Sequence, residues 1–529
     1  MEFHSVLYDR PDYRTEIDGR PAPDYLPDLN LDQLRDALER GRAEYGLGPV
    51  FHAPLRTPAE VAYRQAIVRD LEDDAVRAAV ERFAAGMRKA REHLALAGKL
   101  RERYQKRRWF LAAAAAYRDA VRDLAAGLGA LEPRSAGLRG FRAHVAAHAA
   151  AEPFTAFAAA IDARYADLDS VAYTVHIKGP RVRVGRYDGE HDYGADVTAT
   201  FGKFAQGTVD GVDNPTTVGG VGNPAEVKDY RAAFGEHADM NHVDAQVLAL
   251  VARLFPEVFD ALDAFCDRYA GLVDDTIGAF DREVRFYLAY LELIAPLKEA
   301  GLDFCYPEVA AGPGPVHADA SFDLVLAHKP RRERAPVVTN GFRLDPPERV
   351  LVVTGPNQGG KTTFARMFGQ LHHLAALGLP VPGASVRLRL PDRVFTHFER
   401  EEDAESPRGK LEDELVRVRA VLGEATEASV LVMNESFTST TLHDALFLGT
   451  EILGRVTALG ALCVYVTFVD ELAALNDATV SMVAAITPGD PASRTFRIER
   501  RPADGLAYAA AIADTYGLSY EALKRRLAR

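Results

Sequence analysis

The sequence predicts a multidomain protein in which a mainly α-helical first part, interrupted by a small β insertion, precedes an α/β domain. Apolar residues recur at helical spacing before residue 170 and again over about 242–300, whereas Val171 to Val184 alternates as strands do. From residue 305 onwards, short apolar strands alternate with helices. We therefore expect five segments, 1–170, 171–235, 236–304, 305–505 and a basic helical end at 506–529.

Composition is that of a globular protein in aqueous surroundings. Hydrophobic residues make up 48% and charged residues 26% of the 529 positions, and the formal net charge is −13. That charge excludes polyanion binding over the whole surface, so nucleic acid must be contacted through a local basic surface. Cys266, Cys305 and Cys463 lack metal-type spacing and fit a reducing compartment. Since neither a signal peptide nor a run of about 18 apolar residues is found, we expect a cytoplasmic protein without membrane contact.

A phosphate-binding loop is the most specific motif in the chain. Residues 355–362 satisfy G-x-x-x-x-G-K-[ST], between a predicted strand at 349–354 and a predicted amphipathic helix at 362–377. Such glycines let backbone N–H groups surround a phosphate at a helix N-terminus, and this context argues against a chance Gly-rich turn. Lys361 would reach the β- and γ-phosphates, and the Thr362 hydroxyl would ligate Mg²⁺. The expected nucleotide-binding residues are Gly355, Pro356, Asn357, Gln358, Gly359, Gly360, Lys361, Thr362 and Thr363.

A second strand, predicted at 429–433, should bring polar chemistry to the same site. P-loop enzymes hold Mg²⁺ with an acidic residue at the end of a buried strand, and a neighbouring carboxylate polarises water. Here Asn434 stands in place of the acidic residue and would reach the metal only through a bound water, while Glu435 is placed to orient the attacking water. The hydroxyls at 436 and 438–441 could contact phosphate or cap the helix expected from Leu442, and capping is the commoner role.

These residues resemble the MutS family of DNA mismatch-repair ATPases. The family motif T-G-P-N-x-G-G-K-[ST] is matched by Thr354 to Thr362, and its Pro-Asn pair is more specific than a general P-loop. Over 305–529 the resemblance is carried by 354–362, 392–396, 403–414, 434–435, 439–441, 467–468 and 516–519, the last being similar to a short helix-turn-helix. Weaker resemblance over 25–300 is carried by 53–58, 63–65 and 70–71, and 305–308 is similar to the link into the ATPase domain.

The resemblance implies a helical core and lever region with a clamp-like β insertion, followed by an ABC-like P-loop NTPase domain. It implies ATP and Mg²⁺ as cofactors and Glu435 as the catalytic carboxylate. It also implies a homodimer in which each site borrows a loop of the partner subunit. Double-stranded or branched DNA and repair or recombination proteins are the implied partners. The borrowed loop corresponds to Ser406, Arg408, Gly409 and Lys410.

Several positions depart from the family pattern. Asn434 replaces an aspartate, Phe468 replaces a histidine, and Gly409 replaces the serine that contacts the γ-phosphate of the partner's nucleotide, with Lys410 beside it as a substitute charge. We therefore expect slow hydrolysis, and whether ATP is turned over stays open. Because about 300 residues precede the ATPase part and no Phe-x-Glu wedge is found, we expect a short form without the mismatch-recognition and connector domains.

Two basic segments are candidates for DNA contact. Between Arg88 and Trp109, nine Lys and Arg against two Glu fall on one predicted helix, which either binds phosphate or forms a solvated face paired with acidic neighbours. Alternation in the β insertion places Arg181 and Arg183 on one face. The order of elements favours an antiparallel helical arm with this insertion at its tip. The candidate DNA contacts in the insertion are Lys178, Arg181, Arg183 and Arg186.

Two functions of different classes follow from these features. The leading hypothesis is an ATP-controlled, DNA-binding homodimeric clamp connected with mismatch repair or recombination. The alternative is a nucleotide-gated scaffold for a protein partner, with little ATPase activity and no specific DNA binding. The acidic balance and the departures at the site favour the scaffold, whereas the resemblance as a whole favours the clamp.

Overall fold

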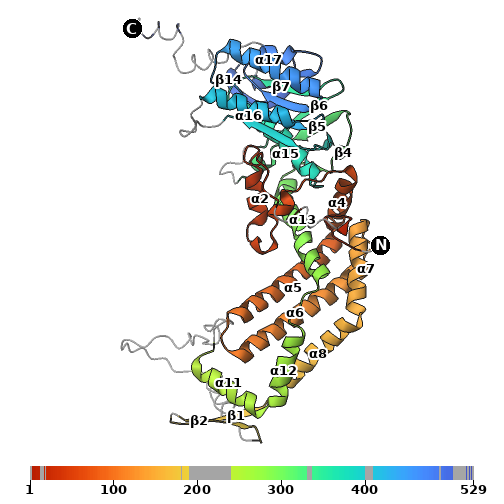
Figure 1. Cartoon of the computed structure of the whole chain (residues 1–529), viewed down its shortest axis with the longest axis vertical. Coiled ribbons are helices and arrows are strands. Elements are labelled where there is room, and N and C mark those ends of the chain that lie inside the picture. The colour runs from red at the N-terminus through yellow and green to blue at the C-terminus, as the bar shows by residue number, and fades with distance from the viewer. Residues whose placement is uncertain are drawn as a thin grey trace, which may run out of the picture. The chain divides into compact units, whose positions relative to one another are not determined.

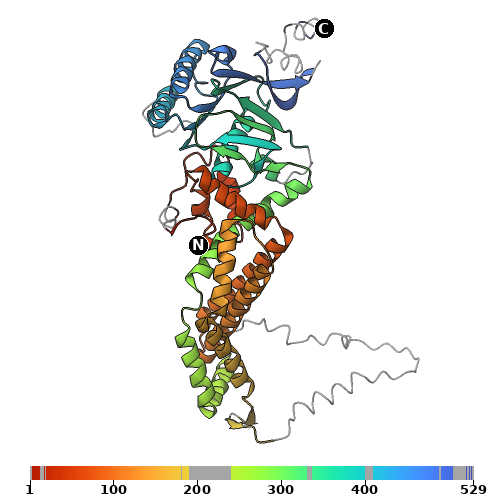
Figure 2. The same cartoon turned by 90° about the vertical axis from the view of Figure 1, so that its right-hand side faces the viewer.

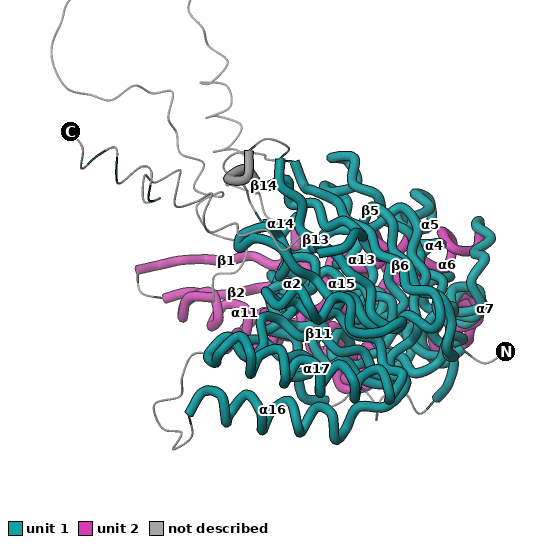
Figure 3. Tube along the Cα trace, turned by 90° about the horizontal axis from the view of Figure 1, so that it is seen from above, with its two compact units in different colours: residues 1–78, 130–144, 275–529 teal, residues 79–129, 145–274 magenta. Residues whose placement is uncertain are grey.

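The computed structural model of the chain (Figures 1 and 2) describes residues 3–11, 17, 20–179, 181–189, 240–329, 336–399, 409–487, 490–503, 520, 524 and 526. The Cα trace divides into two compact units (Figure 3). Unit 1 comprises residues 1–78, 130–144 and 275–529, and unit 2 comprises residues 79–129 and 145–274. Each unit therefore joins segments that are far apart in the sequence. In the described ranges, no helix combines the length and the apolarity that a membrane crossing requires.

Unit 2 is a bundle of antiparallel helices. They are α5 (Asp74–Lys99), α6 (Arg103–Gly129), α7 (Ala136–Ala150), α8 (Glu152–Asp169), α11 (His242–Leu254) and α12 (Pro256–Arg268), of which α5 and α7 begin in unit 1. Gly86 allows α5 and α6 to pack closely, because a Cβ there would lie 2.7 Å from the Ala120 Cβ. Nearer their connection, the His93 and Trp109 rings are 5.0 Å apart. α12 packs against α6 and α8 and completes the bundle.

A β-hairpin lies beside α11 at one end of this bundle (Figure 1). Its strands β1 (Tyr173–Lys178) and β2 (Arg181–Arg186) are antiparallel. They form where the sequence alternates, so the two predicted strands are confirmed, whereas residues 190–235 of the predicted insertion lie outside the described residues. Val184 of β2 packs against a buried apolar cluster that includes Val251, Phe255 and Phe259. The hairpin is therefore anchored to the helices along one of its faces.

The large sheet of unit 1 has the strand order β10-β11-β12-β7-β13-β14. Neighbouring strands from β10 to β13 are parallel, and β14 runs antiparallel to β13. Their bounds are β7 (Val350–Thr354), β10 (Val394–Phe398), β11 (Val430–Asn434), β12 (Leu462–Val466), β13 (Thr479–Thr487) and β14 (Asp490–Arg500). β7, β11 and β12 are buried along their whole length, as continuous apolar runs in a parallel sheet predict. The expected α/β pattern is confirmed.

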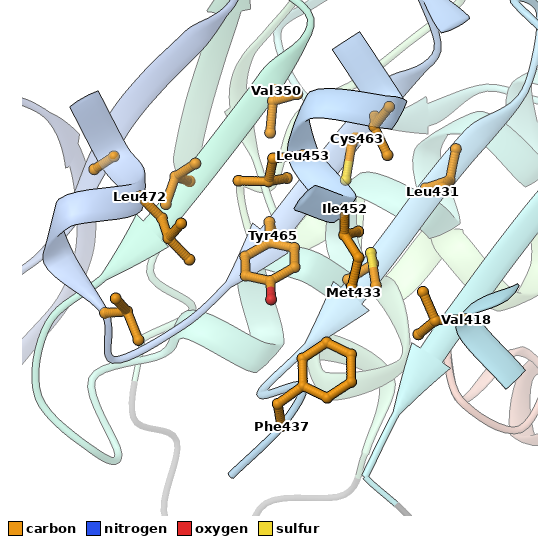
Figure 4. Close-up of a cluster of buried hydrophobic side chains, with 14 of the residues drawn as sticks. Val350, Val418, Leu431, Met433, Phe437, Ile452, Leu453, Cys463, Tyr465 and Leu472 are labelled. Atoms are coloured by element: carbon orange, nitrogen blue, oxygen red, sulfur yellow. The ribbon is translucent and has the colours of Figure 1, made fainter. Parts of the chain in front are cut away.

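Helices cover both faces of this sheet. On one face, α16 (Lys410–Glu424) and α17 (Leu442–Leu459) pack over an apolar cluster that includes Met433, Tyr465 and Leu453 (Figure 4). On the other face, α15 (Lys361–Ala376) packs against β11 and β12. Strand residues alternate between the two faces, so Leu431 and Met433 face α16 and α17, whereas Asn434 faces the side of α15.

Two smaller sheets and several short helices complete unit 1. One sheet has the order β4-β9-β5-β6, and β3 pairs with β8. These strands are β3 (Phe304–Cys305), β4 (Glu308–Ala310), β5 (Val316–Ser321), β6 (Asn340–Leu344), β8 (Val381–Pro382) and β9 (Ser385–Arg389). The helices are α2 (Leu31–Glu39), η2 (Ala43–Tyr45), α3 (Gly48–Phe51), α4 (Pro58–Leu71), α13 (Asp275–Glu299), α14 (Leu324–His328) and η3 (Asp470–Ala474). A capping box of Thr57 and Glu60 starts α4.

The helix that follows the phosphate loop differs from the expectation. Its bounds agree with the predicted helix to within a residue, but α15 is buried on nearly all sides and not only along one stripe. The reason is a chain segment near the N-terminus that covers the face turned away from the sheet. Gln370 donates to the Leu29 carbonyl at 2.9 Å, and Leu55 N–H donates to the Ala376 carbonyl at 2.7 Å. The prediction that one face of this helix is exposed was therefore wrong, because the sequence pattern does not show that a distant segment covers that face.

Candidate functional site

The predicted phosphate loop connects the buried strand β7 to the first turn of α15. Gly360 precedes the helix with φ +94°, and Gly355 at the end of the strand has φ +116°. L side chains rarely adopt these angles. In addition, a Cβ on Gly355 would lie 3.0 Å from the Ala484 backbone nitrogen on β13. Glycine is required at these two positions, and the loop closes around the N-terminus of α15, a location that favours anions.

Lys361 occupies the centre of the loop. Its side chain is 4% exposed. The Nζ donates to the carbonyls of Gly355 at 2.9 Å and Pro356 at 3.2 Å, and to Asn357 Oδ1 at 3.4 Å. Burial lowers the pKa of this ammonium group, and Glu435 opposes that effect. Lys361 is thus a cation held by oxygen atoms that a phosphate oxygen could replace.

Two polar residues, the last residue of β11 and the one that follows it, lie next to the phosphate loop. Glu435 follows the strand with φ +53°, and its Oε1 lies 3.8 Å from the Lys361 Nζ. Asn434 is 7% exposed, and its Oδ1 has no hydrogen-bond partner among the described residues. Leaving a buried acceptor unpaired costs about 1–3 kcal/mol. The orphaned Asn434 oxygen therefore fits a donor such as a metal-bound water, as the sequence predicts for a Mg²⁺ site.

A cavity of about 430 Å³ lies beside the loop. Its walls include Gln358, Gly360, Lys361, Thr362, Thr363 and Glu435 from the predicted site, together with Asp323, Leu326, Pro336, Val337, Val338, Asn340 and Phe496. The cavity joins the loop and the predicted carboxylate in one space. Gly355, Pro356, Asn357 and Gly359 belong to the loop but do not line it.

Phe496 and Asn340 are site residues that sequence analysis missed. Phe496 on β14 is 48% exposed and has φ +58°. Asn340 fixes this backbone, because its Nδ2 donates to the Phe496 carbonyl at 3.1 Å and its Oδ1 accepts the Ile498 N–H at 2.7 Å. An exposed aromatic ring is thereby held at the cavity wall. No local pattern marks either residue, since their relation is made across two sheets.

The hydroxyl-rich stretch after Glu435 has a capping role. Thr441 Oγ1 accepts the Asp444 N–H at 3.2 Å and caps α17, which confirms the capping interpretation for this residue. Thr440 Oγ1 donates to Asp444 Oδ2 at 3.2 Å. Phe468, which stands where a polar residue was expected, follows β12 and is 47% exposed.

The predicted borrowed loop is only partly described. Ser406 and Arg408 lie outside the described residues. Gly409 precedes α16, and the Lys410 ammonium group forms an ion pair with Glu399 of the same chain. The terminal helices expected at 506–529 also lie outside the described residues, apart from positions 520, 524 and 526.

The β-hairpin separates the predicted DNA contacts. Residues directly opposite each other in the hairpin share a face, so Lys178, Arg181 and Arg183 lie together with His176. Arg186 lies on the other face. Its Nε donates to the Leu254 carbonyl at 3.0 Å, and its guanidinium group lies 4.5 Å over the Phe255 ring. The structure thus brings three of the four candidates together and uses Arg186 to attach the hairpin to the helices.

The basic stretch 88–109 does not lie on one helix. α5 ends at Lys99 and α6 begins at Arg103, so the expected single helix was wrong. The two helices instead turn back on each other, because their packing buries side chains that one extended helix would leave in solvent. Arg103 and Arg107 both bind Asp263, with N–O distances of 2.5 and 2.8 Å. For Arg103 and Arg107 the structure therefore favours pairing with acidic neighbours over binding of phosphate.

A comparison with known families identifies part of this chain. Residues 351–514 match the family described as MutS domain V. The matched segment is less than a third of the chain and contains the phosphate loop, β11 and the residues that follow it. This domain is the ATP-binding domain of MutS-like proteins, which bind DNA and work as dimers. Residues 351–514 are thus similar to the ATPase domain of the MutS family.

Proposed function

We propose that this protein is an ATP-controlled, MutS-like DNA-binding clamp that works as a homodimer and hydrolyses ATP slowly. One observation carries the proposal. Lys361 and Glu435, which lie far apart in the matched segment, meet at 3.8 Å on a cavity lined by the phosphate loop. A basic loop residue and a carboxylate in this arrangement are what phosphoryl transfer to water requires.

Each site residue has a distinct role in this proposal. Lys361 binds the phosphates in place of the loop carbonyls, and the Thr362 hydroxyl holds the metal ion. Bound Mg²⁺ would neutralise charge that develops on the phosphate oxygens. Glu435 orients the attacking water by accepting its hydrogen bond. Phe496, whose backbone lies next to Gly360, offers an exposed ring at the cavity wall to the base of the nucleotide.

Asn434 is the reason to expect slow hydrolysis. It occupies the end of β11 on the side of α15, where a carboxylate would hold the metal's water shell with a full charge. Charge-assisted hydrogen bonds are roughly twice as strong as neutral ones. The amide therefore weakens the hold on the metal more than the hold on the nucleotide, and the ATP-bound state persists.

The hairpin is the proposed DNA contact. Lys178, Arg181 and Arg183 place positive charge on one face of a short β-ribbon, in a chain whose net charge is −13. Contacts from such a face to phosphate groups are independent of sequence and depend on salt. In this proposal residues 1–304 form the helical core and lever with the clamp at 171–235, and residues 305–505 form an ABC-like NTPase domain. The short form without mismatch-recognition and connector domains belongs to the same proposal.

The deciding experiment measures DNA binding at several salt concentrations with and without Mg²⁺–ATP. A labelled duplex and a four-way junction are titrated with the full chain, and multi-angle light scattering gives its mass in parallel. We expect the logarithm of the DNA-binding constant to fall linearly with the logarithm of salt concentration and to change on addition of ATP, and we expect the mass of a dimer. If the chain binds ATP but shows no salt-dependent affinity for DNA, the clamp hypothesis is wrong. The nucleotide-gated scaffold, which Asn434 and the acidic balance also favour, would then be the better account.

A further inference from the structure

The short loop after β11 carries the proposed catalytic carboxylate in an unfavourable backbone conformation. Glu435 has φ +53° and Phe437 has φ +63°, and neither is a glycine. L residues avoid this left-handed region, so surrounding contacts must impose it. These two left-handed residues point their side chains in opposite directions. Glu435 reaches Lys361, whereas the Phe437 ring is completely buried in the cluster beneath α16 and α17, next to Met433 and Tyr465 (Figure 4).

Side chains from β10, from Glu399 directly after it and from α16 contact the next three residues of this loop. His397 Nδ1 and Ser436 Oγ are 2.9 Å apart. Glu414 Oε2 accepts the Phe437 N–H at 3.0 Å. Thr438 Oγ1 donates to Glu399 Oε1 at 3.4 Å. Of these three contacts, the hydrogen bond from Phe437 involves the backbone of a left-handed residue. The other left-handed residue, Glu435, donates its own N–H to the Val466 carbonyl of β12 at 2.9 Å, so side-chain support from α16 reaches this backbone at Phe437.

Glu414 is an unusual group to find behind this loop. It lies on α16, is 1% exposed, and its Oε1 has no hydrogen-bond partner among the described residues. Burial raises the pKa of the Glu414 carboxyl group, and the nearby charge of Glu399 raises it further. The hydrogen bond from the Phe437 N–H and the positive charges of Lys410 and Arg417 act in the opposite direction. Tyr465 faces Glu414 from β12. An acid so buried is retained at a cost in stability, and its one described hydrogen bond goes to the strained loop.

We propose that Glu414 is a positioning residue for Glu435. By accepting the Phe437 N–H, it fixes the reversal of the chain that sends the Phe437 ring into the core and the Glu435 carboxylate towards Lys361. The inference rests on the proposed role of Glu435 in hydrolysis. Because Glu414 lies one turn after the start of α16, the position of that helix sets the direction of the carboxylate.

Glu414→Ala, Glu414→Gln and Val418→Ala test this role in the full chain. Gln keeps an oxygen that can accept the Phe437 N–H, whereas Ala removes it. Val418 lies one turn further along α16, is 3% exposed and belongs to the same cluster, so its truncation controls for general loosening of the core. The measurements are single-turnover ATP hydrolysis with excess protein, ATP affinity by titration calorimetry, and hydrogen exchange of the Phe437 amide.

The expected pattern separates positioning from stability. Glu414→Ala should slow hydrolysis by roughly 10–100-fold, since small errors in aim cost that much, while ATP affinity stays within about threefold. Its Phe437 amide should exchange faster. Glu414→Gln should restore most of the rate, and Val418→Ala should lower the melting temperature without changing the rate of the folded protein.

Two results would overturn the inference. Glu414→Ala that hydrolyses ATP at the wild-type rate would remove the positioning role, as would a rate reduction of equal size in Val418→Ala. Glu435→Gln distinguishes this failure from that of the proposed function. If Glu435→Gln abolishes hydrolysis while Glu414→Ala does not slow it, only the positioning role is wrong. If Glu435→Gln keeps full activity, the proposed catalytic site itself is wrong.

Discussion

Replacing Lys361 by methionine is the most direct perturbation of the candidate nucleotide site. Methionine fills nearly the same volume in a position that is 4% exposed, so the change removes charge while most of the packing remains. In the structure the ammonium group gives two close hydrogen bonds to loop carbonyls, at 2.9 and 3.2 Å. When ATP binds, the Lys361 ammonium group would exchange these neutral carbonyl acceptors for charged phosphate oxygens.

The expected size of the effect follows from that exchange. A hydrogen bond to a charged group contributes about 1.5–3 kcal/mol, and one ammonium group reaching two phosphates gains about 3 kcal/mol over the carbonyls it leaves. This corresponds to a decrease of roughly 100-fold in ATP affinity. Titration calorimetry with Mg²⁺–ATP measures it. Lys298→Ala is the control, because Lys298 pairs with Glu72 on the surface of unit 1 and does not line the cavity.

ATP binding by Lys361→Met within about threefold of the wild type, with the same result for Lys298→Ala, would refute this role of the lysine. Such a result would mean that the loop does not cradle phosphate. A melting curve recorded beside the titration excludes unfolding as the cause of a weak signal. Lower affinity in both variants would instead indicate a general electrostatic effect of removing positive charge.

The other predictions concern the metal, the hairpin and the buried histidines. Asn434→Asp should lower the Mg²⁺ concentration for half-maximal ATP hydrolysis, because a carboxylate adds charge to the metal's water shell. Arg181→Ala combined with Arg183→Ala should weaken DNA binding and reduce the salt slope by about 0.9 for each phosphate group that these side chains neutralise. Burial lowers the pKa of His372 to about 4 and of His373 to about 3 from 6.5. Below pH 6.5 the unfolded chain therefore binds more protons, and between pH 7.5 and 5 each histidine should cost about 2 kcal/mol of stability in urea unfolding.

Each of these has a matched comparison. An unchanged Mg²⁺ requirement in Asn434→Asp would exclude that residue from the metal site. For the hairpin, Arg118→Ala is the control, because Arg118 is ion-paired to Asp119 and Asp162 in the bundle. For the histidines, His372→Leu should recover about half of the stability that the wild type loses between the two pH values, and an equal decrease in both proteins would contradict the assigned pKa.

Local features of the chain were predictable from the sequence. The phosphate loop lies between β7 and α15 as its motif requires, because such a motif encodes its own turn through glycines with left-handed or crowded backbones. The strands β11 and β12 are continuous apolar runs, and the alternation in β1 and β2 fixes their faces. These properties depend on neighbours within a few residues, and no distant contact overrides them.

Relations between distant residues were decided by the tertiary structure. The full burial of α15 depends on a covering segment near the N-terminus, and the interruption between α5 and α6 depends on their packing against each other. The same is true of the hydrogen bonds that join Asn340 to Phe496 and Glu414 to Phe437. Spacing along the chain says what a segment can form locally. Which side chain completes its hydrogen bonds, and which face is left for solvent, depends on segments that meet only when the sheet and its helices have packed.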